Sequence, residues 1–260
     1  MRKTRLDLLI TELGLTESRS MAQRLVMAGE VLVNGHMALK PSQMVAPSSI
    51  VEIVQRPRFV SRGGEKLEAA LISFKLVDLT DWVCADLGSS TGGFTDCLLS
   101  HNAKRVYSVD VGYGQLNWKL RNDPRVILME RTNARNLKSL PEWAQLITVD
   151  VSFISLRMIF RVIPRLFGPS GGVVVALIKP QFEAGRADAG RGEGVIKDKG
   201  IHRNVLHKVL GDVEHHGLAV KGLIRSPLIG PKGNVEFLAH LVTGSEGVEI
   251  SRLVDDVLDL

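Results

Sequence analysis

Short apolar runs alternate with helical patterns from residue 65 to the C-terminus, and this alternation restricts the possible folds more than any other feature. Seven runs predict strands, at residues 82–87, 105–109, 126–130, 146–150, 173–178, 219–225 and 235–243. Helical spacing lies between most of them, over 66–75, 92–101, 116–121, 155–167 and 202–216. The run 173–178 is continuously apolar, which is typical of a strand buried on both faces of a parallel sheet. We therefore predict an α/β domain whose sheet is mostly parallel, with an antiparallel edge hairpin formed by the last two strands, which have no helix between them.

The first 55 residues follow a different pattern and predict a small, separate α+β domain. Helical spacing covers 4–13 and 18–28, and Gly14 and Gly29 stand where these helices would end. Asn34-Gly35 follows an apolar run and is a strong hairpin signal, and residues 50–54 predict a further strand. Residues 56–64 are rich in Pro, Gly and Arg. We interpret them as a linker between a domain at 1–55 and a second domain at 65–260.

Charge and apolar content limit the class of protein. Of the net charge of +5, residues 1–62 carry nearly all, with nine Lys or Arg against five Asp or Glu. Such a local excess is typical of a surface that binds nucleic-acid phosphates, and also of a solvated basic face. The apolar run at 171–178 is far shorter than the roughly 18–20 residues that span a bilayer, and the N-terminal apolar stretch breaks at Thr11-Glu12, too soon for a signal peptide. Two isolated cysteines suit a reducing compartment, so we expect a cytoplasmic protein.

The sharpest motif is DLGSSTGGF at 86–94, in which a strand ends in an acid, a glycine turn follows and a helix begins. Glycines let a ligand approach the backbone, and amides at a helix N-terminus favour an anion. The spacing is not that of a dinucleotide fingerprint. Asp110 follows the next strand, where a ribose would be held, and Asn133 follows the strand after it, where an adenine edge would be read. We predict a nucleoside-cofactor site made of Asp86, Gly88, Ser89, Ser90, Thr91, Gly92, Gly93, Phe94, Asp110, Val111, Asn133, Ala134 and Asp150.

Six motifs, in order along the chain, resemble the TlyA (hemolysin A-like) family. They are SRGGEKL at 61–67, DVGYGQL at 110–116, ERTNAR at 130–135, DVSFISL at 150–156, LIKPQFEAG at 177–185 and GNVEFL at 233–238. The resemblance implies an RNA-binding domain of the S-four type followed by a Rossmann-like, FtsJ-like methyltransferase domain. It also implies S-adenosyl-L-methionine as cofactor and a ribose 2′-hydroxyl of ribosomal RNA, on a cytidine, as substrate.

The family's catalytic tetrad falls on Lys66, Asp150, Lys179 and Glu236 of this sequence. Asp150 and Lys179 each follow a predicted strand, so both side chains are expected at the same edge of a parallel sheet. Other readings remain open for three of the four residues. Lys66 would otherwise be a solvated helix lysine, Asp150 a helix cap and Glu236 a charge on an edge strand.

Methyl transfer from a sulfonium has a neutral leaving group and requires no metal, whereas the ribose hydroxyl must lose its proton. A free lysine has a pKa of about 10.4, and burial or a neighbouring cation lowers the pKa of an amine. We assign Lys179 as the base and Lys66 as the neighbouring cation, and expect Asp150 and Glu236 to orient the two amines. The two carboxylates favour the protonated form of each amine. The assignment of Lys179 as the base therefore requires that burial lower the pKa of its amine by more than the carboxylates raise it.

Basic and polar residues of the first domain and the linker form the predicted RNA-binding surface. These residues are Arg5, Arg19, Gln23, Arg24, Lys40, Arg56, Arg58 and Arg62. Arg62 has a second reading, as a brace at the domain junction. Few aromatic residues occur in this part of the chain, which favours recognition of folded RNA by shape and phosphate contacts over base stacking.

Two other classes of function compete with the enzyme. A non-catalytic RNA-binding or ribosome-assembly factor would retain the cofactor fold, although it has no need of two lysines and two acids at the tetrad positions. A membrane-active hemolysin is suggested only by the family's second name. We expect ribosomal RNA or ribosomal subunits as partners, no membrane and no metal, and the sequence leaves the oligomeric state open.

Overall fold

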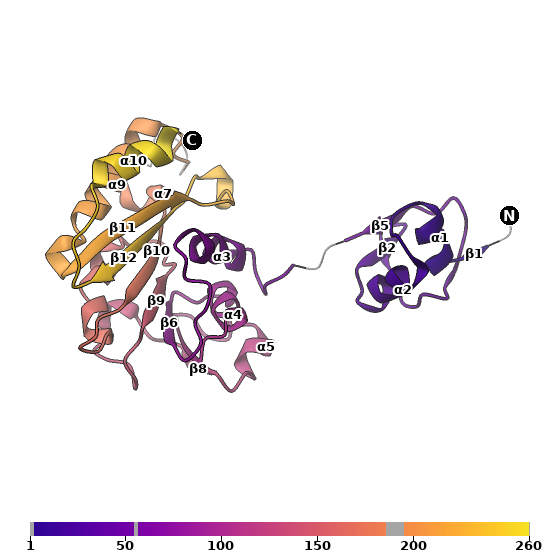
Figure 1. Ribbon diagram of the computed structural model, residues 1–260, viewed down its shortest axis with the longest axis horizontal. Helices are drawn as coiled ribbons and strands as arrows, with labels where there is room; N and C mark the ends of the chain where they lie inside the picture. Colours follow the sequence, from indigo (N-terminus) through magenta and orange to yellow (C-terminus); the bar gives the residue numbers. More distant parts are fainter. Residues whose placement is uncertain (1–2, 55–56, 186–194, 260) are drawn as a thin grey trace. The chain divides into compact units, whose positions relative to one another are not determined.

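The computed structural model describes residues 3–54, 57–185 and 195–259, without the side chain of Pro231, and consists of two compact units (Figure 1). The units are Met1–Pro57 and Arg58–Leu260. Residues 58–64, which we expected to be part of the linker, belong to the second unit. The reason is Phe59, whose side chain is only 4% exposed and packs in the core of that unit.

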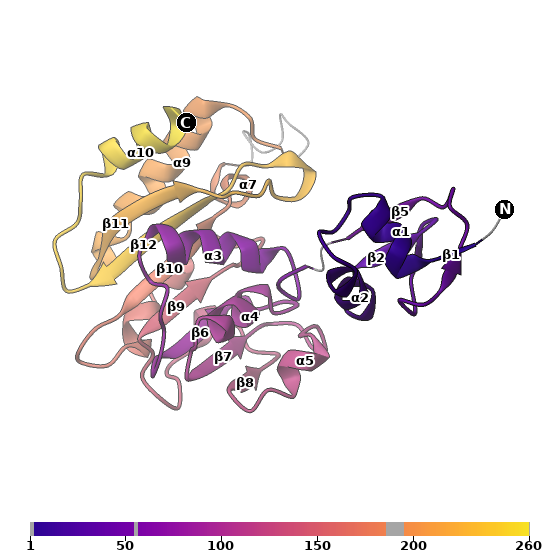
Figure 2. The ribbon, with the colours of Figure 1, turned by 45° about the vertical axis from the view of Figure 1, so that its right-hand side comes forward.

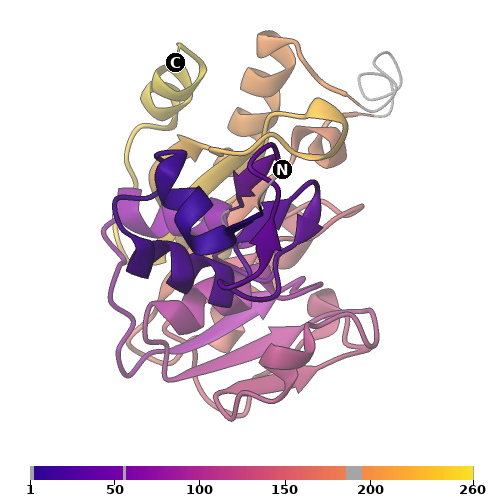
Figure 3. The ribbon, with the colours of Figure 1, turned by 90° about the vertical axis from the view of Figure 1, so that its right-hand side faces the viewer.

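The N-terminal unit packs two helices against short strands (Figure 3). Its elements are β1 (Thr4–Arg5), α1 (Leu6–Glu12), α2 (Arg19–Met27), β2 (Val31–Val33), β3 (His36–Met37), β4 (Met44–Val45) and β5 (Val51–Ile53). The predicted hairpin at Asn34-Gly35 is confirmed, because both residues have the positive φ that a two-residue turn needs, 50° and 78°. The Ser18 side chain accepts a hydrogen bond from the Met21 amide and caps α2. The pairing of β1 with β4 was not predicted, since two-residue strands leave no periodic signal.

The second unit is built on a seven-stranded sheet with the order β11-β12-β10-β9-β6-β7-β8 (Figure 2). Its strands are β6 (Val83–Leu87), β7 (Arg105–Val109), β8 (Val126–Met129), β9 (Leu146–Val149), β10 (Val173–Ile178), β11 (Leu218–Arg225) and β12 (Phe237–Thr243). Neighbouring strands from β10 to β8 are parallel, whereas β12 pairs antiparallel with both β10 and β11. The predicted mostly parallel sheet with an antiparallel edge is therefore confirmed.

Helices cover both faces of this sheet. They are α3 (Gly63–Ser73), α4 (Gly93–Ser100), α5 (Trp118–Arg121), α6 (Arg157–Phe160), α7 (Pro180–Glu183), α9 (Lys199–Gly211) and α10 (Ile250–Asp259), with short 3₁₀ turns at Ala134–Asn136, Ile163–Leu166, Glu214–His216 and Pro231–Gly233. Apolar side chains of α3, α4 and α5 form one core cluster with the sheet, and those of α6, α9 and α10 form the other. In Figure 2, α3 and α4 lie in front of the sheet.

One predicted helix is wrong. Residues 155–167 form two short pieces, α6 and the turn Ile163–Leu166, instead of one helix. Pro164 lacks the backbone N–H that a continuing helix would use, so it starts a new turn. The helix predicted at 202–216 instead begins at Lys199, where the Asp198 side chain accepts a hydrogen bond from the Ile201 amide and caps it.

Candidate active site

The glycine turn after β6 requires glycine at two positions. Gly88 and Gly92 have φ angles of 90° and 99°, which side-chain-bearing residues rarely adopt. A Cβ atom on Gly88 would lie 2.4 Å from the carbonyl oxygen of Asp150, and one on Gly92 would lie 2.3 Å from Leu120 Cδ1. The turn is therefore pressed against the end of β9 on one side and α5 on the other, and its residues Gly88 and Ser90 line open space.

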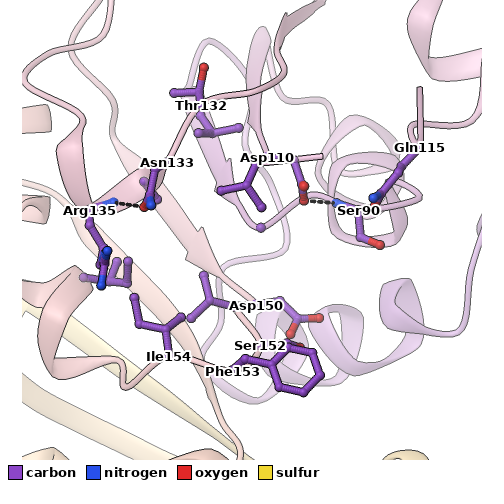
Figure 4. Close-up of a pocket in the computed structure, with 16 residues that line it drawn as sticks. Ser90, Asp110, Gln115, Thr132, Asn133, Arg135, Asp150, Ser152, Phe153 and Ile154 are labelled. Carbon is purple, nitrogen blue, oxygen red and sulfur yellow. Dashed lines mark hydrogen bonds between the residues drawn. The ribbon is translucent and has the colours of Figure 1, made fainter. Parts of the chain in front are cut away.

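A cavity of about 500 Å³ opens beside this turn, at the carboxyl ends of β6, β7 and β9 (Figure 4). Ser90 and Asp110 lie on one side of it, Asn133 and Arg135 on the opposite side, and Phe153 along a third. Residues of the predicted cofactor site that line it are Gly88, Ser90, Asp110, Val111, Asn133, Ala134 and Asp150. Our sequence interpretation missed Val109, Gln115, Thr132, Arg135, Val151, Ser152, Phe153, Ile154 and Ile159, most of which lie inside or next to the motifs quoted above.

The Asp110 carboxylate ties two turns together at the edge of this cavity. It accepts a hydrogen bond from the Ser90 amide at 2.8 Å and another from the Gly112 amide at 2.7 Å. Each carboxylate oxygen can accept a further bond, as a ribose hydroxyl would require. Across the cavity, the Asn133 side-chain oxygen accepts a bond from the Arg135 amide at 3.1 Å, which leaves the amide NH₂ to face a ligand.

Asp86 does not line either cavity next to the turn, contrary to our placement of it in the cofactor site. Its side chain is fully buried and accepts hydrogen bonds from the hydroxyls of Thr95 at 2.7 Å and Thr148 at 3.1 Å. Burial raises the pKa of Asp86 to about 7, although the two hydroxyls favour the carboxylate. Asp86 therefore joins β6, α4 and β9 beneath the turn. Gly92 also faces the protein interior instead of a cavity.

A second cavity of about 210 Å³ contains all four tetrad residues, which form two ion pairs. The Lys66 amine lies 2.5 Å from Glu236 Oε2, and the Lys179 amine lies 2.5 Å from Asp150 Oδ1. The side chains of Lys66 and Lys179 are each 11% exposed and that of Glu236 is fully buried. The structure thus brings the four predicted residues together and rules out the alternative of a solvated helix lysine for Lys66. The remaining predicted residues at this cavity are Ser89, Thr91, Gly93 and Phe94.

The Lys179 amine also donates a hydrogen bond to the Ser152 hydroxyl, at 3.0 Å. The Asp150 carboxylate and the Ser152 hydroxyl thus contact the same amine. The same contacts fix the amine at the carboxyl end of β10, with the Asp150 and Ser152 side chains on the neighbouring loop.

Two aromatic rings line a third cavity, of about 370 Å³, that also reaches Lys179 and Glu236. The rings of Phe153 and Phe182 are 4.9 Å apart, and Phe153 is 90% exposed. A large apolar ring that faces solvent beside a charged site offers a stacking surface for a flat ligand. The motifs at 150–156 and 177–185 contain both rings, but nothing in their spacing indicates that the rings would meet.

A buried carboxylate holds the loop that carries Phe153. Glu183, at the end of α7, accepts hydrogen bonds from the Ser155 hydroxyl and the Leu156 amide, both at 2.7 Å. Burial raises the pKa of Glu183, because a charged carboxylate loses its hydration there. These bonds link the loop after β9 to the segment after β10. Residues 186–194, which follow this segment, lie outside the described part of the chain.

In the N-terminal unit, three predicted RNA contacts converge on a buried acid that our interpretation did not single out. The Asp7 carboxylate accepts hydrogen bonds from Arg5 at 2.9 and 3.0 Å, from Arg19 at 3.0 Å and from Gln23 at 2.7 Å. The Arg5 guanidinium, together with Gln23 and Arg19, holds the pKa of Asp7 well below its usual range. Arg19 and Gln23, both on α2, therefore brace that helix against Asp7 of α1, although Arg5 and Arg19 remain partly exposed.

The other basic residues of the predicted surface differ in their surroundings. Arg24 and Lys40 are exposed. Arg58 forms an ion pair with Glu68, and Arg62 donates to the Ile229 carbonyl at 3.2 Å, so both contact the second unit to which they belong. Arg56 lies outside the described residues.

Two searches over residues 3–54, 57–185 and 195–259 bear on other classes of site. No group of three or more His, Cys, Asp or Glu in these ranges is arranged to hold a metal ion. Within the same ranges, no helix is both long and apolar enough to cross a membrane.

Two protein families match this chain. The family described as FtsJ-like methyltransferase matches residues 59–243, and the S4 domain matches residues 4–51. Among curated proteins, the chain is 46% identical to "Putative rRNA methyltransferase YqxC" of Bacillus subtilis, over 98% of this chain and 91% of that protein. It is 38% identical to the 16S/23S rRNA (cytidine-2′-O)-methyltransferase TlyA of Mycobacterium tuberculosis, over 99% of this chain and 96% of that protein.

Solved structures support the same relationship. A structure described as "Putative hemolysin from Streptococcus thermophilus" superimposes with a TM-score of 0.75 at 42% identity, and the match covers all of this chain and 95% of that one. A structure described as a "putative S-adenosylmethionine dependent methyltransferase from Listeria monocytogenes" superimposes with a TM-score of 0.51 at 15% identity, over 71% of this chain and all of that one, which indicates a shared fold.

Proposed function

Since this chain belongs to the TlyA (hemolysin A-like) family of FtsJ-like methyltransferases, we propose that it transfers a methyl group from S-adenosylmethionine to a ribose 2′-hydroxyl of ribosomal RNA. The Mycobacterium tuberculosis relative, at 38% identity, is named as a cytidine-2′-O-methyltransferase, which supports a cytidine as the target. The observation that carries the proposal is the meeting of two lysine–carboxylate pairs in one cavity beside a glycine turn that borders open space.

The residues around the larger cavity fit the adenosyl part of the cofactor. Gly88 and Asp110 both line this cavity, and the Asp110 carboxylate has acceptor sites for ribose hydroxyls. Asn133 lies on the opposite wall, at a place suited to an adenine edge. When bound, S-adenosylmethionine supplies an electrophilic methyl group on a sulfonium.

Lys179 is the base in this proposal, and its neighbours control the amine. Asp150 and Ser152 hold the amine at the edge of the cavity, and the neutral form of the amine accepts the proton of the 2′-hydroxyl. The ammonium of Lys66, fixed by Glu236, lies in the same cavity and stabilises the developing alkoxide. The carboxylates of Asp150 and Glu236 thus position the two amines and take no direct part in the transfer of the methyl group.

The cavity with the aromatic rings is suited to the target nucleoside. It shares Lys179 and Glu236 with the tetrad cavity, so a nucleoside within it would present its ribose to the amine of Lys179. The exposed ring of Phe153 offers a face for the base, and stacking of a base on an aromatic ring tolerates any sequence.

The S4 domain and the charge of the first 62 residues support RNA as the partner. The exposed side chains of Arg24 and Lys40 are available for phosphate contacts, whereas Arg5 and Arg19 share their charge with Asp7. A reaction on ribosomal RNA or ribosomal subunits would take place in the cytoplasm.

The test is methyl transfer from labelled S-adenosylmethionine to ribosomal subunits isolated without the modification, followed by mapping of the labelled nucleotide. We expect label on a ribose 2′-oxygen of a cytidine. Binding of ribosomal RNA without any transfer would instead identify a non-catalytic RNA-binding factor. Label on a base would contradict the proposed acceptor.

A further inference from the structure

A pocket of about 90 Å³ lies at the carboxyl end of β11 and shares no lining residue with the three cavities described above. Three of the residues that line it are cations, Lys197, Lys199 and Arg225, and none of its described lining residues is an Asp or a Glu. The buried side chains of Phe237 and Leu258 make part of its wall apolar. A small hollow lined by charges of one sign concentrates their field, so this pocket favours an anion.

The cations of this pocket have donors to spare. The side chains of Lys197 and Arg225 are exposed, and neither forms a hydrogen bond or an ion pair with any residue in 3–54, 57–185 or 195–259. Lys199 donates to the Leu258 carbonyl at 2.6 Å, which leaves two of the three donors of its ammonium group. The acid between the two lysines, Asp198, caps α9 and does not line the pocket. An anion can therefore bind here without displacing an acidic side chain.

His202 forms a buried side of the pocket and links it to the aromatic cavity. Its Nε2 lies 3.0 Å from the Ile196 carbonyl oxygen, which can only accept, so Nε2 carries a proton. Burial lowers the pKa of His202, and the charge of Arg225 lowers it further. The Ile196 amide donates to Asn234 Oδ1 at 3.0 Å, and Asn234 lines the cavity that contains Phe153. Two hydrogen bonds thus fix the basic pocket to the wall of the cavity suited to the target nucleoside.

The register of the sheet also places the pocket near the tetrad. Arg225 of β11 is the cross-strand partner of Phe237 in β12, and Phe237 is the partner of Ile178 in β10. Glu236 directly precedes Phe237, and Lys179 directly follows Ile178. Two strand spacings, roughly 10 Å, therefore separate the end of β11 from the end of β10. An RNA chain that presents a ribose to Lys179 can reach Arg225 with its neighbouring backbone.

We propose that Lys197, Lys199 and Arg225 bind a backbone phosphate of the RNA beside the target nucleotide, an inference that rests on the proposed function. A guanidinium presents paired donors to phosphate oxygens, and the two ammonium groups add charge. Contacts to phosphates fix the register of a nucleic acid on a protein and carry no sequence information. This contact would hold the RNA so that the target ribose faces Lys179.

The experiment measures binding of the full chain to ribosomal subunits isolated without the modification, at several salt concentrations. Lys197→Gln and Arg225→Gln each remove one cation and keep a long polar side chain. We expect each to weaken binding about five- to tenfold at roughly 0.1 M salt, and to reduce the slope of log affinity against log salt by about one. Lys221→Gln removes another exposed cation of β11, outside the pocket, and is the matched control. Affinity for S-adenosylhomocysteine should be the same in all three variants.

Two results would overturn the inference. Equal slopes for the two pocket variants and the control would show that only net charge matters. Calorimetric binding of inorganic phosphate that Arg225→Gln abolishes, together with unchanged affinity for subunits, would assign the pocket to a free phosphate compound.

Methyl transfer to the same subunits tests the proposed function separately. Subunit binding that depends on Lys197 and Arg225, without any methyl transfer by the unaltered chain, would support the phosphate site and contradict the methyltransferase.

Discussion

The Lys66 amine lies 2.5 Å from a carboxylate oxygen of Glu236, although 170 residues separate the two in the sequence. The pair joins the first turn of α3 to the residue that directly precedes β12. The position of the Lys66 amine therefore depends on the folding of two segments that lie near opposite ends of the methyltransferase unit in the sequence.

Loss of either partner of this pair should destabilise the fold. Glu236→Leu or Lys66→Met leaves a buried charge without its partner, which costs about 3–5 kcal/mol, whereas the double variant removes both charges and should recover most of this loss. Denaturant unfolding of the three variants measures the free energy of unfolding. All three should lack methyl transfer. Single variants as stable as the parent chain would show that the pair contributes nothing to the fold.

Asp110 should be needed for cofactor binding. Asp110→Ala removes acceptors at the edge of the larger cavity and releases the Ser90 amide, so we expect S-adenosylmethionine to bind more weakly by about 1–3 kcal/mol. Calorimetric titration gives the affinity. Asp123→Ala, whose carboxylate pairs with Arg125 away from the cavities, is the control. Equal affinity of the Asp110 variant and the control would exclude Asp110 from the site.

The stability of the methyltransferase unit should fall as the pH rises from about 4 to 7. The pKa of Asp86 is about 7 in the folded chain and 3.8 for a free side chain, so over this range the folded state keeps a proton that the unfolded state loses. The slope from this residue alone is at most about 1.4 kcal/mol per pH unit, and the contribution is constant above about pH 8. Asp86→Asn should remove it. Unfolding curves of the parent chain and the Asp86→Asn variant at several pH values are the measurement. If the free energy of unfolding had the same pH dependence in both proteins, the raised pKa of Asp86 would be contradicted.

The site shows which parts of a sequence prediction hold and why others fail. Asp150 and Lys179 were expected together because the ends of parallel strands share one edge of a sheet, and they do form a pair. The burial of Asp86 was not foreseen, because a residue at the end of a strand can face either the ligand or the layer beneath it. Phe59 stands in a segment rich in Arg and Pro, and only the tertiary fold shows that its ring enters the core. Asp7 was likewise hidden, since its partners Arg19 and Gln23 lie on the next helix, 12 and 16 residues further along the chain.

RNA binding should depend on exposed charge of the N-terminal unit. Arg24→Glu places an acid on the exposed face of α2, so the affinity for ribosomal RNA should fall and its dependence on log salt should flatten by about one. Lys104→Glu makes the same charge change at an exposed position of the second unit and serves as the control. Binding at several salt concentrations is the measurement. Identical slopes for the two variants would show that the effect of Arg24 is one of net charge and not of a contact.

Single-turnover methylation of ribosomal subunits by Lys179 variants tests the central claim most directly, because the proposal makes this amine the proton acceptor. Lys179→Ala should slow transfer at least about 100-fold while affinity for S-adenosylmethionine changes little. Lys179→Arg should not restore it, since a guanidinium stays protonated and cannot accept the proton. Near-native transfer by the arginine variant would contradict the account, because it would show that Lys179 acts through its positive charge and that another group removes the proton.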